Sequence, residues 1–87
     1  MHKYIIKHYI DKLRLTDVKK FISDNNYNVT DDELHIIYNT IKNDWHELLY
    51  GNYNSVFNKI KSHFNEDTYN DMINLYHYYK NKYKSYL

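Results

Sequence analysis

Apolar residues recur every three or four positions along most of this 87-residue chain, and the longest such stretch lies within residues 30–51. Its apolar positions are separated by 4, 3, 4 and 3 residues, which places them on one side of an α-helix about four turns long. They are Leu34, Tyr38, Ile41, Trp45 and Leu48. We expect a long central helix over residues 31–50, with this stripe, Trp45 included, buried under the other segments.

The central helix has recognisable ends. Thr30 is a favoured N-cap, and Glu33 follows three residues later, the spacing of a capping box. Gly51, the single glycine of the chain, stands where a left-handed C-cap is expected. Asn43 and Asp44 are two poor helix formers in succession and could divide the helix. The unbroken apolar stripe favours a single helix.

Two shorter helices are predicted before the central one. Residues 2–14 carry apolar side chains at positions i, i+4 and i+8, a pattern typical of an amphipathic helix. The stripe consists of Ile5, Tyr9 and Leu13. Thr16 is an N-cap candidate for a second helix over residues 17–25. Asn25 and Asn26 should end that helix, because Asn tolerates the left-handed conformation.

Two further helices are predicted after the central one. Asn52 or Asn54 would cap the fourth helix, and Asn65 would cap the fifth. The apolar line of the fifth helix consists of Tyr69, Met72, Ile73, Tyr76 and Tyr83. The chain has no proline and no alternating strand pattern. We therefore predict an all-α fold, a compact bundle of four to five helices forming one domain over residues 1–87.

Composition supports a folded domain and narrows its class. Hydrophobic residues make up 43% of the chain and aromatic residues 18%, more than a disordered segment contains. The formal net charge is +1, which gives little general attraction to nucleic acid or to anionic membranes. The absence of cysteine excludes disulfides and thiolate chemistry. No apolar run approaches the roughly 20 residues of a membrane span, so we expect a cytoplasmic protein without a membrane partner.

The order of caps and stripes resembles the YqfT-like proteins, a family of small, uncharacterised helical proteins of low-GC Gram-positive bacteria. The shared features are Thr16-Asp17-Val18, the turn over residues 25–30, and Asp67-Thr68-Tyr69. The chain departs from the family pattern at Asn43, where a glycine is usual, and at Asn65-Glu66, where Ser-Pro is common. The resemblance implies a helical fold and no catalytic residues.

The sequence offers no catalytic or metal-binding constellation. A helical zinc site needs two ligands at i and i+3 or i+4, and no two of the six histidines have that spacing. The carboxylates at 31–33 and 66–67 are explained as helix-start residues. There is no glycine-rich phosphate loop and no serine with a nucleophile signature. We therefore expect no enzyme, no cofactor, no metal and no small-molecule substrate.

The last helix carries more aromatic surface than a small bundle needs for its core. We expect Tyr79, Tyr83 and Tyr86 to bind protein, because tyrosine is enriched in interface hot spots and brings large area at low rotamer cost. The partner would be another protein or a second copy of the chain. The role would be that of an adaptor, a regulator or an inhibitor, of the kind that mobile elements encode. The other interpretations are that these rings close the bundle, or that AT-biased coding enriches tyrosine.

The alternative function is nucleic-acid binding. Its basic residues would lie on the first two helices and among the C-terminal tyrosines, where phosphate contacts and base stacking can combine. They are Lys19, Lys20, Lys80, Lys82 and Lys84. Against this interpretation, eleven acidic residues nearly balance twelve basic ones, and no helix is rich in the Arg, Asn and Gln of recognition helices.

Overall fold

A computed structural model describes residues 2–87, apart from the side chain of His2; Met1, the first residue of the expected domain, lies outside them. Over the described residues the chain forms helices and no strand, which confirms the predicted all-α bundle. The helices are α1 (His2–Lys12), α2 (Leu15–Asp24), α3 (Asp31–Tyr50), α4 (Tyr53–Ile60), η1 (Lys61–His63), α5 (Glu66–Lys82) and η2 (Lys84–Tyr86).

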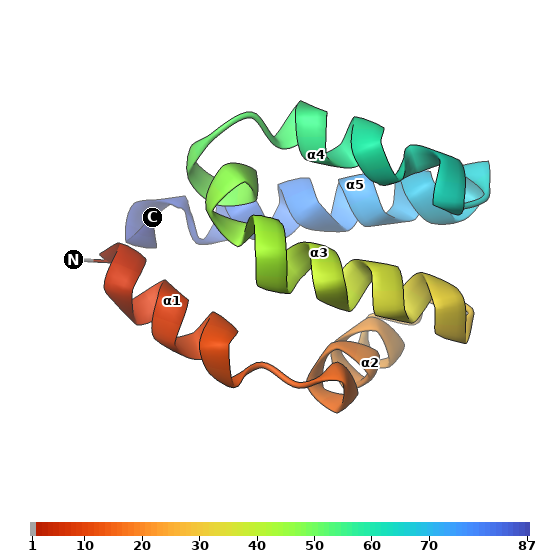
Figure 1. Ribbon diagram of the computed structural model, residues 1–87, viewed down its shortest axis with the longest axis horizontal. Coiled ribbons are helices and arrows are strands. Elements are labelled where there is room, and N and C mark those ends of the chain that lie inside the picture. Colours follow the sequence, from red (N-terminus) through yellow and green to blue (C-terminus); the bar gives the residue numbers. More distant parts are fainter. Residues whose placement is uncertain (1) are drawn as a thin grey trace.

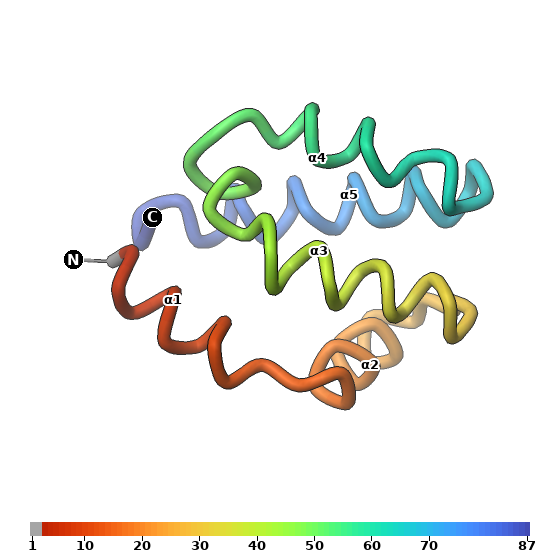
Figure 2. The backbone as a smooth tube through the Cα atoms, viewed as in Figure 1, coloured from red at the N-terminus to blue at the C-terminus, as the bar shows by residue number. Residues whose placement is uncertain are grey.

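The helix α3 is the centre of the bundle. It runs between α4 on one side and α1 and α2 on the other (Figure 1), and it contacts all three. The backbone trace in Figure 2 shows α5 passing along the same side as α4 before the chain ends. The prediction of one central helix over residues 31–50 is confirmed, and Asn43 and Asp44 do not interrupt it.

The start of α3 has the predicted capping box. The Thr30 Oγ1 accepts a hydrogen bond from the Glu33 amide at 3.1 Å, and the Glu33 carboxylate accepts one from the Thr30 amide at 2.8 Å. Glu33 is a buried carboxylate, and this bond supplies its partner. Two backbone donors that the helix leaves free are thereby satisfied.

The end of α3 differs from the prediction. Gly51 has φ −122°, so the expected left-handed C-cap is absent. A Cβ on Gly51 would lie 2.6 Å from the Glu47 carboxylate, which accepts a hydrogen bond from the Asn52 amide at 2.8 Å. The glycine is therefore needed for space rather than for a positive φ. It leaves room for the carboxylate that links α3 to the start of α4.

The start of α2 also differs from the prediction. The helix begins at Leu15 with Arg14 in the N-cap position, so Thr16 lies inside the helix and does not cap it. The reason is Asp17, whose carboxylate accepts a hydrogen bond from the Arg14 amide at 2.9 Å. The predicted stop is confirmed, because α2 ends at Asp24 and Asn26 has φ 64°.

The helix α1 is attached mainly through its C-terminal end. The Lys42 ammonium donates to the Ile10 carbonyl at 2.7 Å, and the Tyr38 hydroxyl donates to the Leu13 carbonyl at 3.2 Å. These donors satisfy carbonyls that the end of a helix leaves free. The apolar stripe of α1 lies mostly on the surface, because Ile5 and Tyr9 are exposed.

The core consists of two buried clusters rather than one. Cluster 1 lies between the end of α3, α4 and α5, and its buried members are Leu48, Val56, Phe57, Ile60 and Tyr69. Cluster 2 lies between α2 and the first half of α3, and its buried members are Val18, Ile22 and Leu34. The apolar stripe of α3 is therefore shared between two packing partners.

Trp45 does not occupy the core position that was predicted. It is only partly buried and belongs to neither cluster, and its indole lies edge-on to the His46 ring at 5.5 Å. The stripe of α3 divides on either side of this residue. Tyr38 and Ile41 pack against cluster 2, whereas Leu48 belongs to cluster 1.

The last two long helices begin as predicted. The side chain of Asn52 accepts from the Ser55 amide at 3.3 Å, and that of Asn65 accepts from the Thr68 amide at 2.8 Å. Four of the five residues on the predicted inner line of α5 belong to cluster 1 or pack against it: Tyr69, Met72, Ile73 and Tyr76. Tyr83 does not, and it lies exposed at the C-cap of α5.

Candidate functional site

The C-terminal tyrosines form a continuous run of rings, which we name the C-terminal tyrosine surface: Tyr78, Tyr79, Tyr83 and Tyr86. The rings of Tyr79 and Tyr83 are nearly parallel, with centroids 6.2 Å apart, because residues four apart lie on one helix face. The ring of Tyr86 lies 6.1 Å from that of Tyr83, since η2 turns the chain back after α5. Tyr83 is 46% exposed and Tyr86 is 61% exposed.

Lys82 adds a positive charge to this surface. Its ammonium nitrogen lies 5.9, 5.7 and 5.4 Å from the ring centroids of Tyr78, Tyr79 and Tyr83. These distances are within the range in which a cation is attracted to the face of an aromatic ring. The surface therefore combines apolar ring area, phenol hydroxyls and one cation.

Tyr79 differs from the other tyrosines because it also faces inward. Its ring lies 5.1 Å from that of Phe21 on α2, and its hydroxyl donates to the side-chain oxygen of Asn25 at 3.3 Å. It is half-buried, in contrast to Tyr83 and Tyr86. Of the three predicted binding residues, Tyr79 links α5 to α2, and the other two are free to contact a partner.

The five lysines of the alternative function lie in different environments. Lys20 donates to the Asp24 carboxylate at 2.7 Å, and this hydrogen bond raises the pKa of the Lys20 ammonium. Lys80 is partly buried, donates to the Leu48 carbonyl at 3.4 Å and lies 4.9 Å from the ring centroid of Tyr53. The remaining three are exposed: Lys19, Lys82 and Lys84.

Within the described residues, no three His, Asp or Glu side chains are placed to hold a metal ion. The side chain of His2 lies outside them. Asp11 has a lowered pKa because Lys7 donates a hydrogen bond to its carboxylate, but this pair is exposed on α1. A solvated i, i+4 ion pair is a surface feature and gives no catalytic group.

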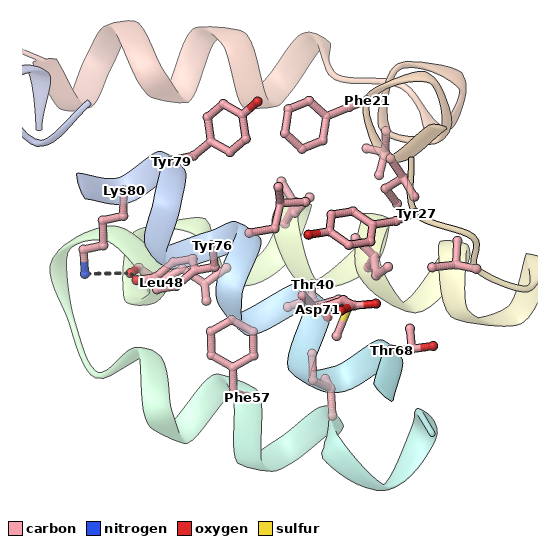
Figure 3. Close-up of a pocket in the computed structure, with 18 of the residues that line it drawn as sticks. Phe21, Tyr27, Thr40, Leu48, Phe57, Thr68, Asp71, Tyr76, Tyr79 and Lys80 are labelled. Carbon is pink, nitrogen blue, oxygen red and sulfur yellow. Dashed lines mark hydrogen bonds between the residues drawn. The ribbon is translucent and has the colours of Figure 1, made fainter. Parts of the chain in front are cut away.

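A feature that the sequence reasoning missed is an apolar cavity of about 360 Å³, which is lined by residues of α2, α3, α4 and α5 and is partly open to solvent. Figure 3 shows Phe21 and Tyr79 together at one side of it and Tyr27 and Thr40 further along. Members of both core clusters line it, among them Val18, Ile22, Leu48, Phe57 and Ile60. The cavity thus occupies the place where the two clusters would meet.

Several polar groups in the wall of the cavity already have partners. The Thr40 hydroxyl donates to the Ile36 carbonyl at 2.7 Å, and the Tyr76 hydroxyl donates to the Leu48 carbonyl. Lys80 points away from the cavity toward that same carbonyl (Figure 3). The inner surface is consequently almost entirely carbon.

The cavity is large for so small a domain. Protein interiors are close-packed, and voids larger than a water molecule are few. Because this space is partly open to solvent, it is a pocket that a ligand can enter rather than a sealed void. An apolar ligand in it would cover carbon surface that water otherwise contacts, and would stabilise the folded state by binding to it.

No motif in the sequence marks the cavity directly, but the spacing of certain residues along α5 is related to it. Side chains of α5 and its C-cap line the cavity at spacings of 4, 3, 4 and 4 residues: Thr68, Met72, Leu75, Tyr79 and Tyr83. This is a second stripe beside the one that packs on cluster 1. Sequence alone reads both as core, because a lining residue and a packed residue have the same spacing.

None of the helices within residues 2–87 is long and apolar enough to cross a bilayer. Comparisons with protein-family models, with curated proteins and with solved structures find no match for this chain. The resemblance to the YqfT-like proteins therefore stays a prediction. The function has to be argued from the surface and the cavity themselves.

Proposed function

We propose that this protein is a non-enzymatic helical module that binds another protein through the C-terminal tyrosine surface. One observation supports the proposal most: the neighbouring rings of Tyr83 and Tyr86 are 46% and 61% exposed. Exposed rings at adjacent positions provide the large, rigid contact area that interface hot spots use. In this proposal the protein acts in the cytoplasm as an adaptor, a regulator or an inhibitor.

The chemistry of the surface suggests the kind of partner. Lys82 lies among the rings without a carboxylate within salt-bridge distance among the described residues. A partner with an apolar patch beside an Asp or Glu would therefore fit it, because the ion pair would form where the rings exclude water. A second copy of the chain fits less well, since it would bring a second Lys82 of the same charge.

The test compares two double variants in affinity capture from native lysate, with and without nuclease. Tyr83→Ala with Tyr86→Ala should lose the captured protein. Tyr4→Ala with Tyr9→Ala is the matched control, because these tyrosines are 79% and 70% exposed and belong to a different helix, α1. If both double variants retain the same partner at unchanged stability, the assignment of the surface is wrong.

Nucleic-acid binding is the alternative outcome of this experiment. Lys82 and Lys84 are exposed beside tyrosine rings, which favours phosphate contacts combined with stacking. Reversing the charge of Lys19, Lys20 and Lys84, which take no part in the proposed ion pair, should then abolish binding and leave a tyrosine-centred protein interface largely intact. Loss of every partner on nuclease treatment would replace the leading proposal with this one.

A further inference from the structure

The cavity lined by α2, α3, α4 and α5 is an elongated space, which we call the channel. Its lining follows α5 from Thr68 to Tyr83, which corresponds to about 22 Å of helix. The volume of about 360 Å³ therefore lies beside about four turns of α5, so an extended hydrocarbon chain can lie along the helix.

The same dimensions exclude a peptide helix as the occupant. One turn of α-helix with its side chains is about 10 Å across and 5.4 Å long, which corresponds to about 420 Å³. That single turn already exceeds the cavity. A helix from a partner protein or from a second copy of this chain could therefore only lie over the open side of the cavity and not inside it.

The wall of the channel favours an apolar ligand, because carbon makes up nearly all of its surface. The hydroxyls of Thr40, Tyr76 and Tyr79 are donated to protein oxygens, and the Tyr27 hydroxyl is among the few polar groups left in the wall. A ligand with many polar groups in the interior would lose more hydrogen bonds to water than these groups can replace. The exposed lining residues with polar side chains are Asn28, Asp71 and Tyr83.

We propose that this channel binds the hydrocarbon chain of a small amphiphile, with the head group left at the solvent-exposed end. A cavity of about 150 Å³ holds the six carbon atoms of benzene, so about 360 Å³ has room for about twelve to fourteen carbon atoms. The channel shares Tyr79 and Tyr83 with the C-terminal tyrosine surface, but the rest of its lining is separate from that surface, so ligand binding is tested here on Leu75 and Thr40.

The first experiment uses the wild-type chain and saturated fatty acids of 6 to 16 carbon atoms, with the n-alcohols of the same lengths. Each is titrated below its critical micelle concentration by isothermal calorimetry. The association constant should rise by up to about fourfold for each added methylene, because each carbon moves from water to an apolar wall. The rise should stop at about twelve to fourteen carbon atoms, when the channel is full.

Comparing each fatty acid with the alcohol of the same length shows whether the head group contributes to binding. Equal affinity for acid and alcohol identifies a ligand recognised by its chain alone. A preference for the acid identifies a free fatty acid. An association constant that does not change with chain length overturns the proposal, and so does the absence of binding at every length.

A filling variant tests the location. Leu75 lines the cavity and packs against neither core cluster, so Leu75→Trp adds a ring to the empty space. We expect at least a tenfold loss of affinity for the best ligand, with an unchanged or higher Tm. Tyr78→Trp is the matched control, because Tyr78 is exposed on the same helix and does not line the cavity.

A second filling variant keeps the test informative if Leu75→Trp fails to fold. Thr40→Leu enlarges a lining residue on α3, and the hydroxyl that it removes bonds only the Ile36 carbonyl of the same helix. It should reduce affinity in the same direction. Wild-type affinity in a folded Leu75→Trp or Thr40→Leu variant would show that the chain binds elsewhere and would overturn the assignment.

Discussion

At the scale of single residues, the Tyr50 hydroxyl stands out because it is buried and has no hydrogen-bond partner among the described residues. A buried donor without a partner costs about 1–3 kcal/mol. Tyr50→Phe should therefore leave the free energy of unfolding unchanged or raise it by up to about 1 kcal/mol, as measured by urea denaturation. The matched change Tyr38→Phe removes a hydroxyl that donates to the Leu13 carbonyl and should lower stability by about 1 kcal/mol. Equal losses for both variants would contradict this assignment.

Trp45 gives a second prediction at this scale. A fully buried tryptophan costs about 3–5 kcal/mol on replacement by alanine, but Trp45 is only partly buried and lies outside both clusters. We expect Trp45→Ala to lower the free energy of unfolding by about 1–2 kcal/mol. Leu34→Ala is the comparison, because Leu34 is 4% exposed and should cost about 2–5 kcal/mol. A larger loss at Trp45 than at Leu34 would show that the tryptophan is core after all.

At the scale of elements, the caps set the length of each helix, and two threonines test this directly. Thr30 accepts a hydrogen bond at the start of α3, whereas Thr16 lies inside α2 and caps nothing. Thr30→Ala should therefore cost about 1 kcal/mol. Thr16→Ala should be neutral or slightly stabilising, because alanine has the higher helix propensity. Thermal unfolding of both variants by circular dichroism measures the difference, and a loss at Thr16 as large as that at Thr30 would contradict it.

The same elements show what the sequence could and could not predict. Caps at Thr30, Asn52 and Asn65 depend on residues three apart, so the sequence alone located them. Thr16 was misassigned because Asp17, one residue later, satisfies the Arg14 amide and starts the helix earlier. Whether a stripe meets a partner helix depends on the whole arrangement of the bundle. For that reason no local feature of the sequence predicted the exposed face of α1 or the cavity beside α5.

At the scale of the whole molecule, the bundle consists of two packed halves joined across a cavity. Cluster 1 holds α4 and α5 to the end of α3, and cluster 2 holds α2 to its beginning. The stripe of α3 runs through both, which is why a single apolar seam in the sequence corresponds to two cores in the structure. Across the cavity, Tyr79 contacts Phe21 and Asn25 directly and so joins α5 to α2.

This arrangement predicts where the molecule opens when the link is removed. Tyr79→Ala deletes the ring contact with Phe21 and the hydrogen bond to Asn25, so the C-terminal half of α5 and the end of α2 should lose their mutual support. Native-state amide hydrogen exchange should become about tenfold faster in those two segments, which is the effect of about 1.4 kcal/mol of local opening free energy. Amides of α4 should exchange at the wild-type rate, because cluster 1 is intact.

Tyr83→Ala is the control variant. It removes a neighbouring, exposed ring that does not reach Phe21, and it should leave amide exchange in α2 unchanged. Uniformly faster exchange in every helix would mean that the two halves open as one unit, and unchanged exchange in α2 would mean that Tyr79 is not the link between them.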